Sequence, residues 1–210
     1  MILINLKKYE SKIFDFFTLK TIISEQDREF IENSRRGEIR VIRNGVNTDY
    51  FVPRDTKKEF DLVFTGNMSY PPNIDSVCYL VEEILPVVWK LNPDVNLLIS
   101  GTNPTARVKA LASKNVKVTG WVDDIRKSYS IAKIFVAPMR IGTGLQNKLL
   151  EAMAMKIPCI TTSLANNALG AEKNQSILIG NDSKEFASQI LGLLNDDKQR
   201  AEIGENGFNF

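Results

Sequence analysis

The chain of 210 residues contains no histidine and only two cysteines. The absence of histidine excludes an imidazole general base, and any zinc site that needs an imidazole ligand, within this chain. Cys78 and Cys159 each lie inside an apolar run, without metal-ligand spacing or the density of a disulfide framework. We therefore expect two buried free thiols and no metal site.

Long hydrophobic runs and an excess of charge are also absent. No apolar stretch reaches the roughly 20 residues of a membrane span, and the start of the chain lacks the features of a signal peptide. The net charge is +2, from 27 basic and 25 acidic residues, and the basic residues are scattered. We therefore expect a cytoplasmic protein that does not bind nucleic acid.

From residue 60 onward, short apolar runs alternate with helical stretches. The runs are apolar throughout, which is typical of a parallel sheet covered on both faces. Their alternation with helices predicts an α/β fold with a doubly wound, Rossmann-like parallel sheet. We expect strands at 60–65, 95–100, 116–119, 134–137, 159–162 and 176–179, and helices at 73–91, 105–113, 123–132, 145–155 and 183–195.

The first fifty residues predict an incomplete N-terminal appendage. Apolar residues have helical spacing over 3–18, β-rich segments follow at 21–23 and 39–42, and Ser24 precedes an acidic turn that predicts a capped helix. Residues 51–58 contain Pro53 and several charges, which indicates a linker. Because the part before the linker is too small for a complete domain, and the chain stops abruptly, we expect a fragment of a longer enzyme.

In a doubly wound sheet, ligands bind beyond the carboxyl ends of the strands. Gly66-Asn67 follows the first strand of the main domain, and its glycine lets the backbone approach a ligand, although a tight turn would also need one. Gly101-Thr102 and Gly120-Trp121 follow the next two strands, where a nucleotide base could lie against backbone and a flat ring. Ordinary core packing is the alternative for Trp121.

The most specific pattern is the run PMRIGTGLQNKLLEAMA at 138–154. An apolar strand leads into a glycine-containing turn that opens a helix, and such a helix start offers N–H groups and partial positive charge to an anion. Arg140 and Lys148 flank the turn with charges that could offset a diphosphate. Glu151 shares a helical face with Lys148 and could accept hydrogen bonds from ribose hydroxyls, although a surface Lys–Glu pair is the alternative.

Two other glycine motifs are excluded. Asn147 stands where the dinucleotide fingerprint needs its third glycine, and no Gly-Lys-Ser/Thr follows the turn to complete a P-loop.

The run PMRIGTGLQNKLLEAMAMKIPCITT resembles the donor-site signature of retaining GT-B glycosyltransferases, the group 1 (family 4) sugar transferases. NGVNTDYFVP resembles the segment that joins their two domains, and GNMSYPPNIDSV is similar to the first donor-domain loop of a bacterial exopolysaccharide-associated subgroup. The resemblance covers about residues 24–206. It implies that 51–210 is the nucleotide-sugar (donor) binding domain, the C-terminal half of a GT-B fold, and that 1–50 is a remnant of the N-terminal acceptor domain and the interdomain segment.

By this resemblance, Glu151 matches the second glutamate of an E-x7-E signature, whose carboxylate holds the ribose. Thr143 replaces the first glutamate, which usually contacts the sugar ring, and no basic residue follows the first-strand glycine, so we expect Arg140 and Lys148 to replace it. The residue patterns and the resemblance together predict a catalytic set of Arg140, Lys148 and Glu151, and a donor-binding set of Gly66, Asn67, Gly101, Thr102, Trp121, Thr143, Gly144, Leu145, Gln146 and Asn147.

The resemblance implies transfer of a sugar from a nucleoside diphosphate-sugar to an acceptor hydroxyl with retention, in glycan or exopolysaccharide synthesis, without a cofactor or a required metal. The acceptor, a glycan or a lipid-linked molecule, would bind an N-terminal domain, and the full-length enzyme could associate peripherally with the inner membrane. We expect this chain alone to be inactive. The alternatives are a nucleotide-sugar epimerase-like enzyme and a non-catalytic nucleotide-binding or scaffold module; the Thr143 departure makes the module plausible.

Overall fold

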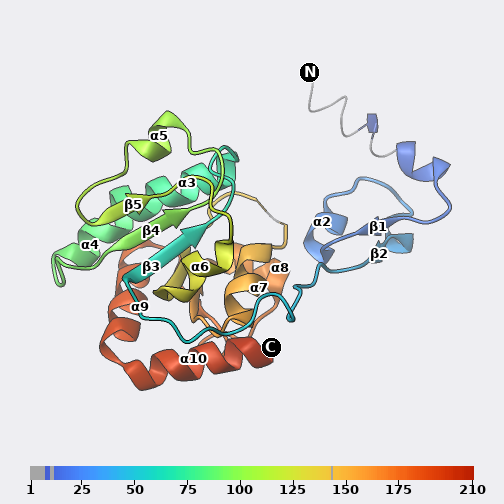
Figure 1. Cartoon of the computed structure of the whole chain (residues 1–210). Helices are drawn as coiled ribbons and strands as arrows, with labels where there is room; N and C mark the ends of the chain where they lie inside the picture. Colours follow the sequence, from blue (N-terminus) through green and yellow to red (C-terminus); the bar gives the residue numbers. More distant parts are fainter. Residues whose placement is uncertain (1–7, 10–11, 143) are drawn as a thin grey trace.

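The structure, a computed structural model, describes residues 8–9, 12–142 and 144–210. A six-stranded sheet forms the centre of the main domain, and every pair of neighbouring strands is parallel (Figure 1). The predicted doubly wound α/β fold is therefore confirmed. In chain order the strands are β3 (Phe60–Thr65), β4 (Leu97–Ser100), β5 (Val116–Val118), β6 (Ala132–Ala137), β7 (Cys159–Thr161) and β8 (Leu178–Ile179).

The strand order is β5-β4-β3-β6-β7-β8, so the chain winds outward from β3 in one direction and then from β6 in the other. Val63 of β3 pairs with Leu98 on one side and with Phe135 on the other, which places β3 and β6 side by side in the middle of the sheet. The reversal between these two strands is the topological switch point, where the loops diverge and leave room for a ligand.

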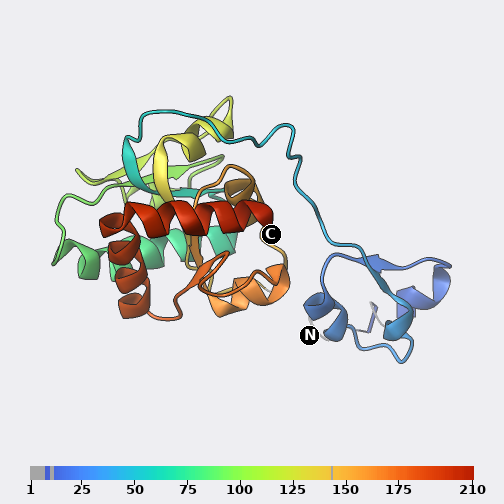
Figure 2. The same ribbon diagram turned by 90° about the horizontal axis from the view of Figure 1, so that it is seen from below.

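Helices cover both faces of the sheet because parallel strands need crossover connections, and these are right-handed. This handedness places α3 (Pro71–Tyr79), η3 (Leu80–Ile84), α4 (Leu85–Trp89) and α5 (Ala106–Lys109) on one face, and α6 (Ile125–Ser130), α7 (Asn147–Ala154) and α8 (Ser163–Leu169) on the other. Helix α9 (Ser183–Asn195) packs on η3 and α4, and α10 (Asp197–Asn209) packs on α7 and α9 (Figures 1 and 2).

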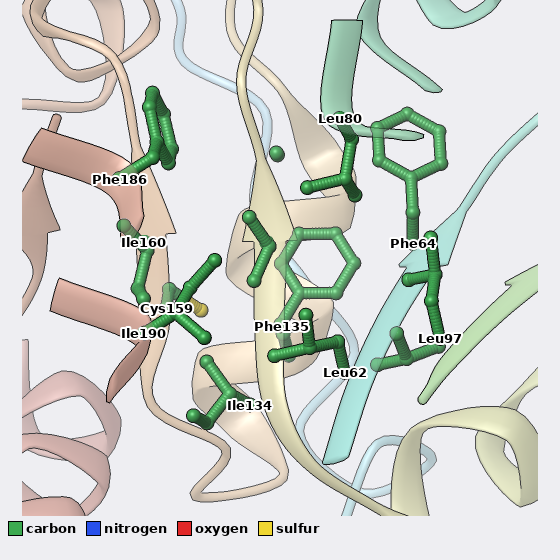
Figure 3. Close-up of a cluster of buried hydrophobic side chains, with 14 of the residues drawn as sticks. Leu62, Phe64, Leu80, Leu97, Ile134, Phe135, Cys159, Ile160, Phe186 and Ile190 are labelled. Carbon is green, nitrogen blue, oxygen red and sulfur yellow. The ribbon is translucent and has the colours of Figure 1, made fainter. Parts of the chain in front are cut away.

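The core lies between the sheet and these helices (Figure 3). The rings of Phe64 and Phe135 stack with centroids 6.4 Å apart, and both side chains are fully buried. Cys78 and Cys159 are buried free thiols, as expected from the sequence. Burial raises the pKa of the Cys159 thiol far above its ordinary value, so this thiol stays protonated and packs as a small apolar group.

Two helices were not expected from the sequence, and a third differs in form. Helix α10 has few apolar residues and packs through small ones, since Gly204 lies against the Lys156 carbonyl and Gly207 against that of Ser176. Helix α8 is short, with Thr162 as its N-cap. The expected helix at 73–91 is present as three consecutive segments, because the π-helical turn η3 lies between α3 and α4. The turn directly precedes the start of α4, where Pro86 has no backbone N–H to donate.

The N-terminal segment forms a small unit of its own, joined to the sheet by residues 42–59, which contain no helix or strand (Figure 2). Its strands β1 (Thr21–Ile22) and β2 (Arg40–Val41) are parallel, and the Ser24 hydroxyl caps α2 (Glu25–Glu29) as predicted, with Asp27 N donating to it at 3.0 Å. The expected helix at 3–18 falls partly outside the described residues, and its described part includes the 3₁₀ turn η1 (Phe14–Phe16). A second 3₁₀ turn, η2 (Arg36–Glu38), precedes β2.

In the described part of the chain, no helix is both long enough and apolar enough to cross a membrane.

The carboxyl ends of β3 and β4 touch so closely that only glycine fits. A Cβ at Gly101, where φ is +144°, would lie 1.8 Å from the carbonyl oxygen of Gly66. We expect Gly101→Ala to lower the free energy of unfolding by about 3 kcal/mol or more, measured by urea denaturation. Gly192→Ala is the matched control, since Gly192 is an exposed residue of α9 where a Cβ would meet nothing within 4 Å, and the substitution should stabilise by up to about 1 kcal/mol. Equal unfolding midpoints for the two variants would contradict this account.

Candidate functional site

A cavity of about 450 Å³ opens at the carboxyl edge of the sheet. Its walls come from the loops that follow β3, β4 and β5 and from the first turns of α7, so it spans the switch point between β3 and β6. The structure brings ten of the candidate residues together there: Gly66, Asn67, Gly101, Thr102, Trp121, Leu145, Gln146, Asn147, Lys148 and Glu151.

Five lining residues were missed at the sequence level: Thr65, Tyr70, Asn73, Val122 and Ile125. They belong to the same loops as the residues that were found, but none is a glycine or a charged residue, so no local pattern distinguishes them. Asn73 is the exception, since a buried amide in the first turn of a helix beside a glycine turn is a candidate ligand residue by position alone.

Asn73 connects the two halves of the site across the switch point. Its Nδ2 donates to the carbonyl of Asn67 at 2.9 Å, and its Oδ1 accepts from the Lys148 ammonium. The first bond fixes which end of the amide faces which partner, because only the nitrogen can donate to a carbonyl. Asn73 therefore holds Lys148 in place over the loop that follows β3.

Lys148 carries a positive charge in a place that is partly shielded from water. Its Nζ lies 4.7 Å from the centroid of the Phe64 ring, a cation–π contact. Burial lowers the pKa of Lys148 to about 8, and the opposing negative charge of Glu151 offsets only part of that effect. Among the described residues that line the cavity, Lys148 is the only basic one, so an anionic ligand would find its counter-charge there.

Glu151 is held by a fully buried phenol. Tyr129 of α6 donates its hydroxyl to Glu151 Oε2 at 2.7 Å. Burial, and then the charge of Glu151, raise the pKa of Tyr129 well above its ordinary value, so the hydroxyl stays protonated and keeps donating. One carboxylate oxygen is thus bonded to Tyr129, and Glu151 is one of the residues that line the cavity.

The helix that carries both charged residues begins at Asn147, two residues later than expected. Gln146 occupies the N-cap position, but its side chain makes no capping bond and instead donates to the Gly144 carbonyl at 3.0 Å. The first-turn amides of α7 are therefore not capped by this side chain. Such amides, together with the helix dipole, favour a negative group at the mouth of the cavity.

Two of the expected site residues that the structure describes, Arg140 and Gly144, do not line the cavity. Arg140 forms a bidentate pair with Asp75, at 2.7 and 3.1 Å, and its guanidinium lies 4.2 Å from the centroid of the Tyr79 ring. The structure thus does not bring Arg140 together with Lys148 and Glu151. Gly144 faces Asp27 of α2, and Thr143 lies outside the described residues.

Trp121 lies at the rim of the cavity and is 72% exposed, so core packing is the wrong alternative for this residue. The part of the chain that the structure describes contains no group of three or more histidine, cysteine, aspartate and glutamate side chains placed to hold a metal ion.

The sheet order and the position of the cavity define a Rossmann-like ligand-binding domain. The family described as Glycosyl transferases group 1 matches residues 59–196, which include the whole sheet and every residue that lines the cavity. The chain therefore belongs to the group 1 glycosyltransferase family.

Individual relatives are more distant. An uncharacterized 44.6 kDa protein in the cps region of Klebsiella pneumoniae is 26% identical over 159 residues, 71% of this chain and 41% of that protein. The capsular polysaccharide biosynthesis glycosyltransferase CapM of Staphylococcus aureus is 33% identical over 95 residues, 44% of this chain and 25% of CapM.

Among solved structures, Anabaena HepE in complex with UDP and glucose superposes with a TM-score of 0.80 and 16% identity, over 97% of this chain and 61% of HepE. This likeness shows a shared fold, that of GT-B glycosyltransferases. The chain spans less than two thirds of the length of each of these three proteins.

The lowered pKa of Lys148 predicts how stability changes with pH. Between pH 8 and the ordinary lysine value near 10.5, the unfolded chain binds more protons than the folded one, so stability rises with pH in that window. Below pH 8 the full cost of burying the charge is present. We therefore expect Lys148→Met to raise the melting temperature by a few degrees at pH 7 and by less at pH 10, measured by thermal unfolding. A stability gain that is the same at both pH values would contradict the assignment.

Proposed function

We propose that this chain is the donor-binding domain of a glycosyltransferase that takes a sugar from a nucleoside diphosphate-sugar. The observation that carries the proposal is the arrangement in the cavity. The N-terminus of α7, the half-buried ammonium of Lys148 and the carboxylate of Glu151, which Tyr129 holds, lie together at the switch point. Membership of the group 1 family and the UDP and glucose bound to HepE support it.

The diphosphate binds at the N-terminus of α7. Its oxygens accept from the first-turn amides of Asn147 and Lys148, and the Lys148 ammonium supplies the full positive charge. Because these donors are fixed before the donor substrate arrives, they also stabilise the charge that builds on the diphosphate as the sugar leaves. Arg140 does not take part, because its charge is already paired with Asp75.

The nucleoside lies along the other wall. Glu151 accepts hydrogen bonds from the vicinal ribose hydroxyls, and the base rests between the Gly101-Thr102 backbone and the ring of Trp121. Gly101 presents only backbone to the base, and the loops after β3 and β4 can meet there because a Cβ at Gly101 would clash with the Gly66 carbonyl.

The sugar passes with retained configuration to the hydroxyl of a glycan or lipid-linked acceptor, in the synthesis of a capsular or other exopolysaccharide at the cytoplasmic face of the membrane. Since the chain spans 41% of its K. pneumoniae relative, we infer that another part of the enzyme binds the acceptor. The 210-residue chain alone then binds the donor and transfers no sugar. Detection of sugar transfer by the isolated chain would contradict this division of labour.

Removal of the cavity's lysine should weaken the binding of every diphosphate. We expect Lys148→Ala to raise the dissociation constants of UDP, GDP or ADP, and of inorganic pyrophosphate, about tenfold or more, measured by titration calorimetry. Lys184→Ala is the control, because Lys184 is an exposed residue of α9, which contributes nothing to the cavity, and it should bind like the wild type. Unchanged binding by Lys148→Ala would reject the proposed diphosphate site.

A substitution of Trp121, at the rim of the cavity, should affect binding of the base and leave binding of the diphosphate unchanged. We expect Trp121→Ala to weaken nucleoside diphosphate binding about tenfold, because base–aromatic stacking is worth about 1–3 kcal/mol, while pyrophosphate binding stays at the wild-type value. The measurement is calorimetric titration of both ligands. Equal losses for both would show that Trp121 supports the cavity and does not contact the base.

A further inference from the structure

Lys148 and Glu151 are oppositely charged, three residues apart on α7, and yet not paired. Opposite charges at this spacing lie on one helical face and ordinarily attract each other. In the described part of the chain, however, the Lys148 ammonium bonds to Asn73 and the Glu151 carboxylate to Tyr129, and no ion pair joins the two. Each charge is therefore held by its own uncharged anchor, one from α3 and one from α6.

The Tyr129 hydroxyl has three oxygen neighbours, and the shortest bond that it donates goes to Glu151. Its Oη lies 2.6 Å from Thr65 Oγ1 and 2.7 Å from Glu151 Oε2. The Glu151 carboxylate and the Lys148 carbonyl, at 3.3 Å, only accept, so the phenol proton points chiefly along the shorter bond to Glu151. The Thr65 hydroxyl then donates to Tyr129. The resulting chain from Thr65 through Tyr129 to Glu151 is polarised toward the carboxylate, which strengthens the last bond.

Packing fixes the position of that phenol. The Tyr129 ring contacts Phe135 of β6, with centroids 5.6 Å apart, and Phe51, with centroids 6.3 Å apart, and the whole residue is buried. The ring therefore cannot follow Glu151 if the carboxylate moves. Glu151 has three side-chain torsions, and without this fixed donor its carboxylate is free to turn toward the ammonium one helical turn away.

We propose that Tyr129 is a positioning residue that keeps Glu151 apart from Lys148, so that the carboxylate is available to the ribose and the ammonium to the diphosphate. This inference rests on the proposed function. Tyr129 itself does not line the cavity, so its effect on a ligand passes through Glu151. Loss of the phenol hydroxyl then harms both ends of the ligand, because the two released charges neutralise each other.

The test uses Tyr129→Phe in the 210-residue chain, with two readouts. The first is the ratio of the dissociation constants of 2′-deoxyribonucleoside and ribonucleoside diphosphates, which should fall about fivefold or more as Glu151 leaves the ribose. The second is inorganic pyrophosphate, whose binding should weaken severalfold because Glu151 now pairs with Lys148. Adding Glu151→Gln to Tyr129→Phe should restore pyrophosphate binding, since a neutral amide does not neutralise the ammonium.

Tyr79→Phe is the matched control, because Tyr79 is also a buried tyrosine of the domain but lies beneath Arg140, away from the cavity. It should leave both readouts at wild-type values. Asn73→Ala removes the other anchor and should likewise weaken pyrophosphate binding, so the inference can be tested even if Tyr129→Phe does not fold.

Two results separate the inference from the function on which it rests. If the wild-type chain binds diphosphates and Tyr129→Phe behaves like Tyr79→Phe, the positioning role is wrong and the donor site stands. If Glu151→Gln fails to restore pyrophosphate binding in the Tyr129→Phe background, the loss is general damage and the inference is overturned. If the wild-type chain binds neither nucleotides nor pyrophosphate, both the proposed function and the inference are wrong.

Discussion

The hydrogen bond between the buried phenol of Tyr129 and the carboxylate of Glu151 is the contact on which the rest of the site depends. It joins α6 to α7, and through Thr65 it joins both helices to the end of β3. These elements border the switch point of the sheet, so one hydroxyl links three of the elements that form the cavity. A buried phenol that could not donate would cost more than an apolar ring, which explains why its partners are so closely placed.

The cavity concentrates function in few charges. Lys148 and Glu151 are the only charged residues among those described that line it, and both are held by neutral groups. The remaining surface is backbone, amide and hydroxyl side chains, and apolar and aromatic groups. Burial of the Lys148 ammonium has a free-energy cost, because the charged form loses hydration, and the lowered pKa of Lys148 reflects this cost. Binding sites often lower the stability of a fold in this way, because their charged groups are held in place before a ligand binds.

Most of the fold could be predicted because its signals are local. Apolar runs mark the strands, and all six expected strands are present, with ends that differ by at most two residues. Helix α10 was missed because its buried positions are mostly glycines, which have no side chain to produce a periodic pattern. The cavity was predicted in part. The glycine turns and the charged helix start stand out in the sequence and Asn73 has a suggestive position, but nothing local marks Tyr129 as the partner of Glu151.

The sequence by itself determined the class of fold, the loops that form the cavity and the presence of two opposite charges on α7, because each depends on residues that are close together in the chain. Only the tertiary structure decided what the charges do. Arg140 is drawn away by Asp75, which is 65 residues distant, while Lys148 and Glu151 are separated by anchors 75 and 22 residues away. Spacing along a helix cannot reveal such partners, because the packing of distant elements brings them together.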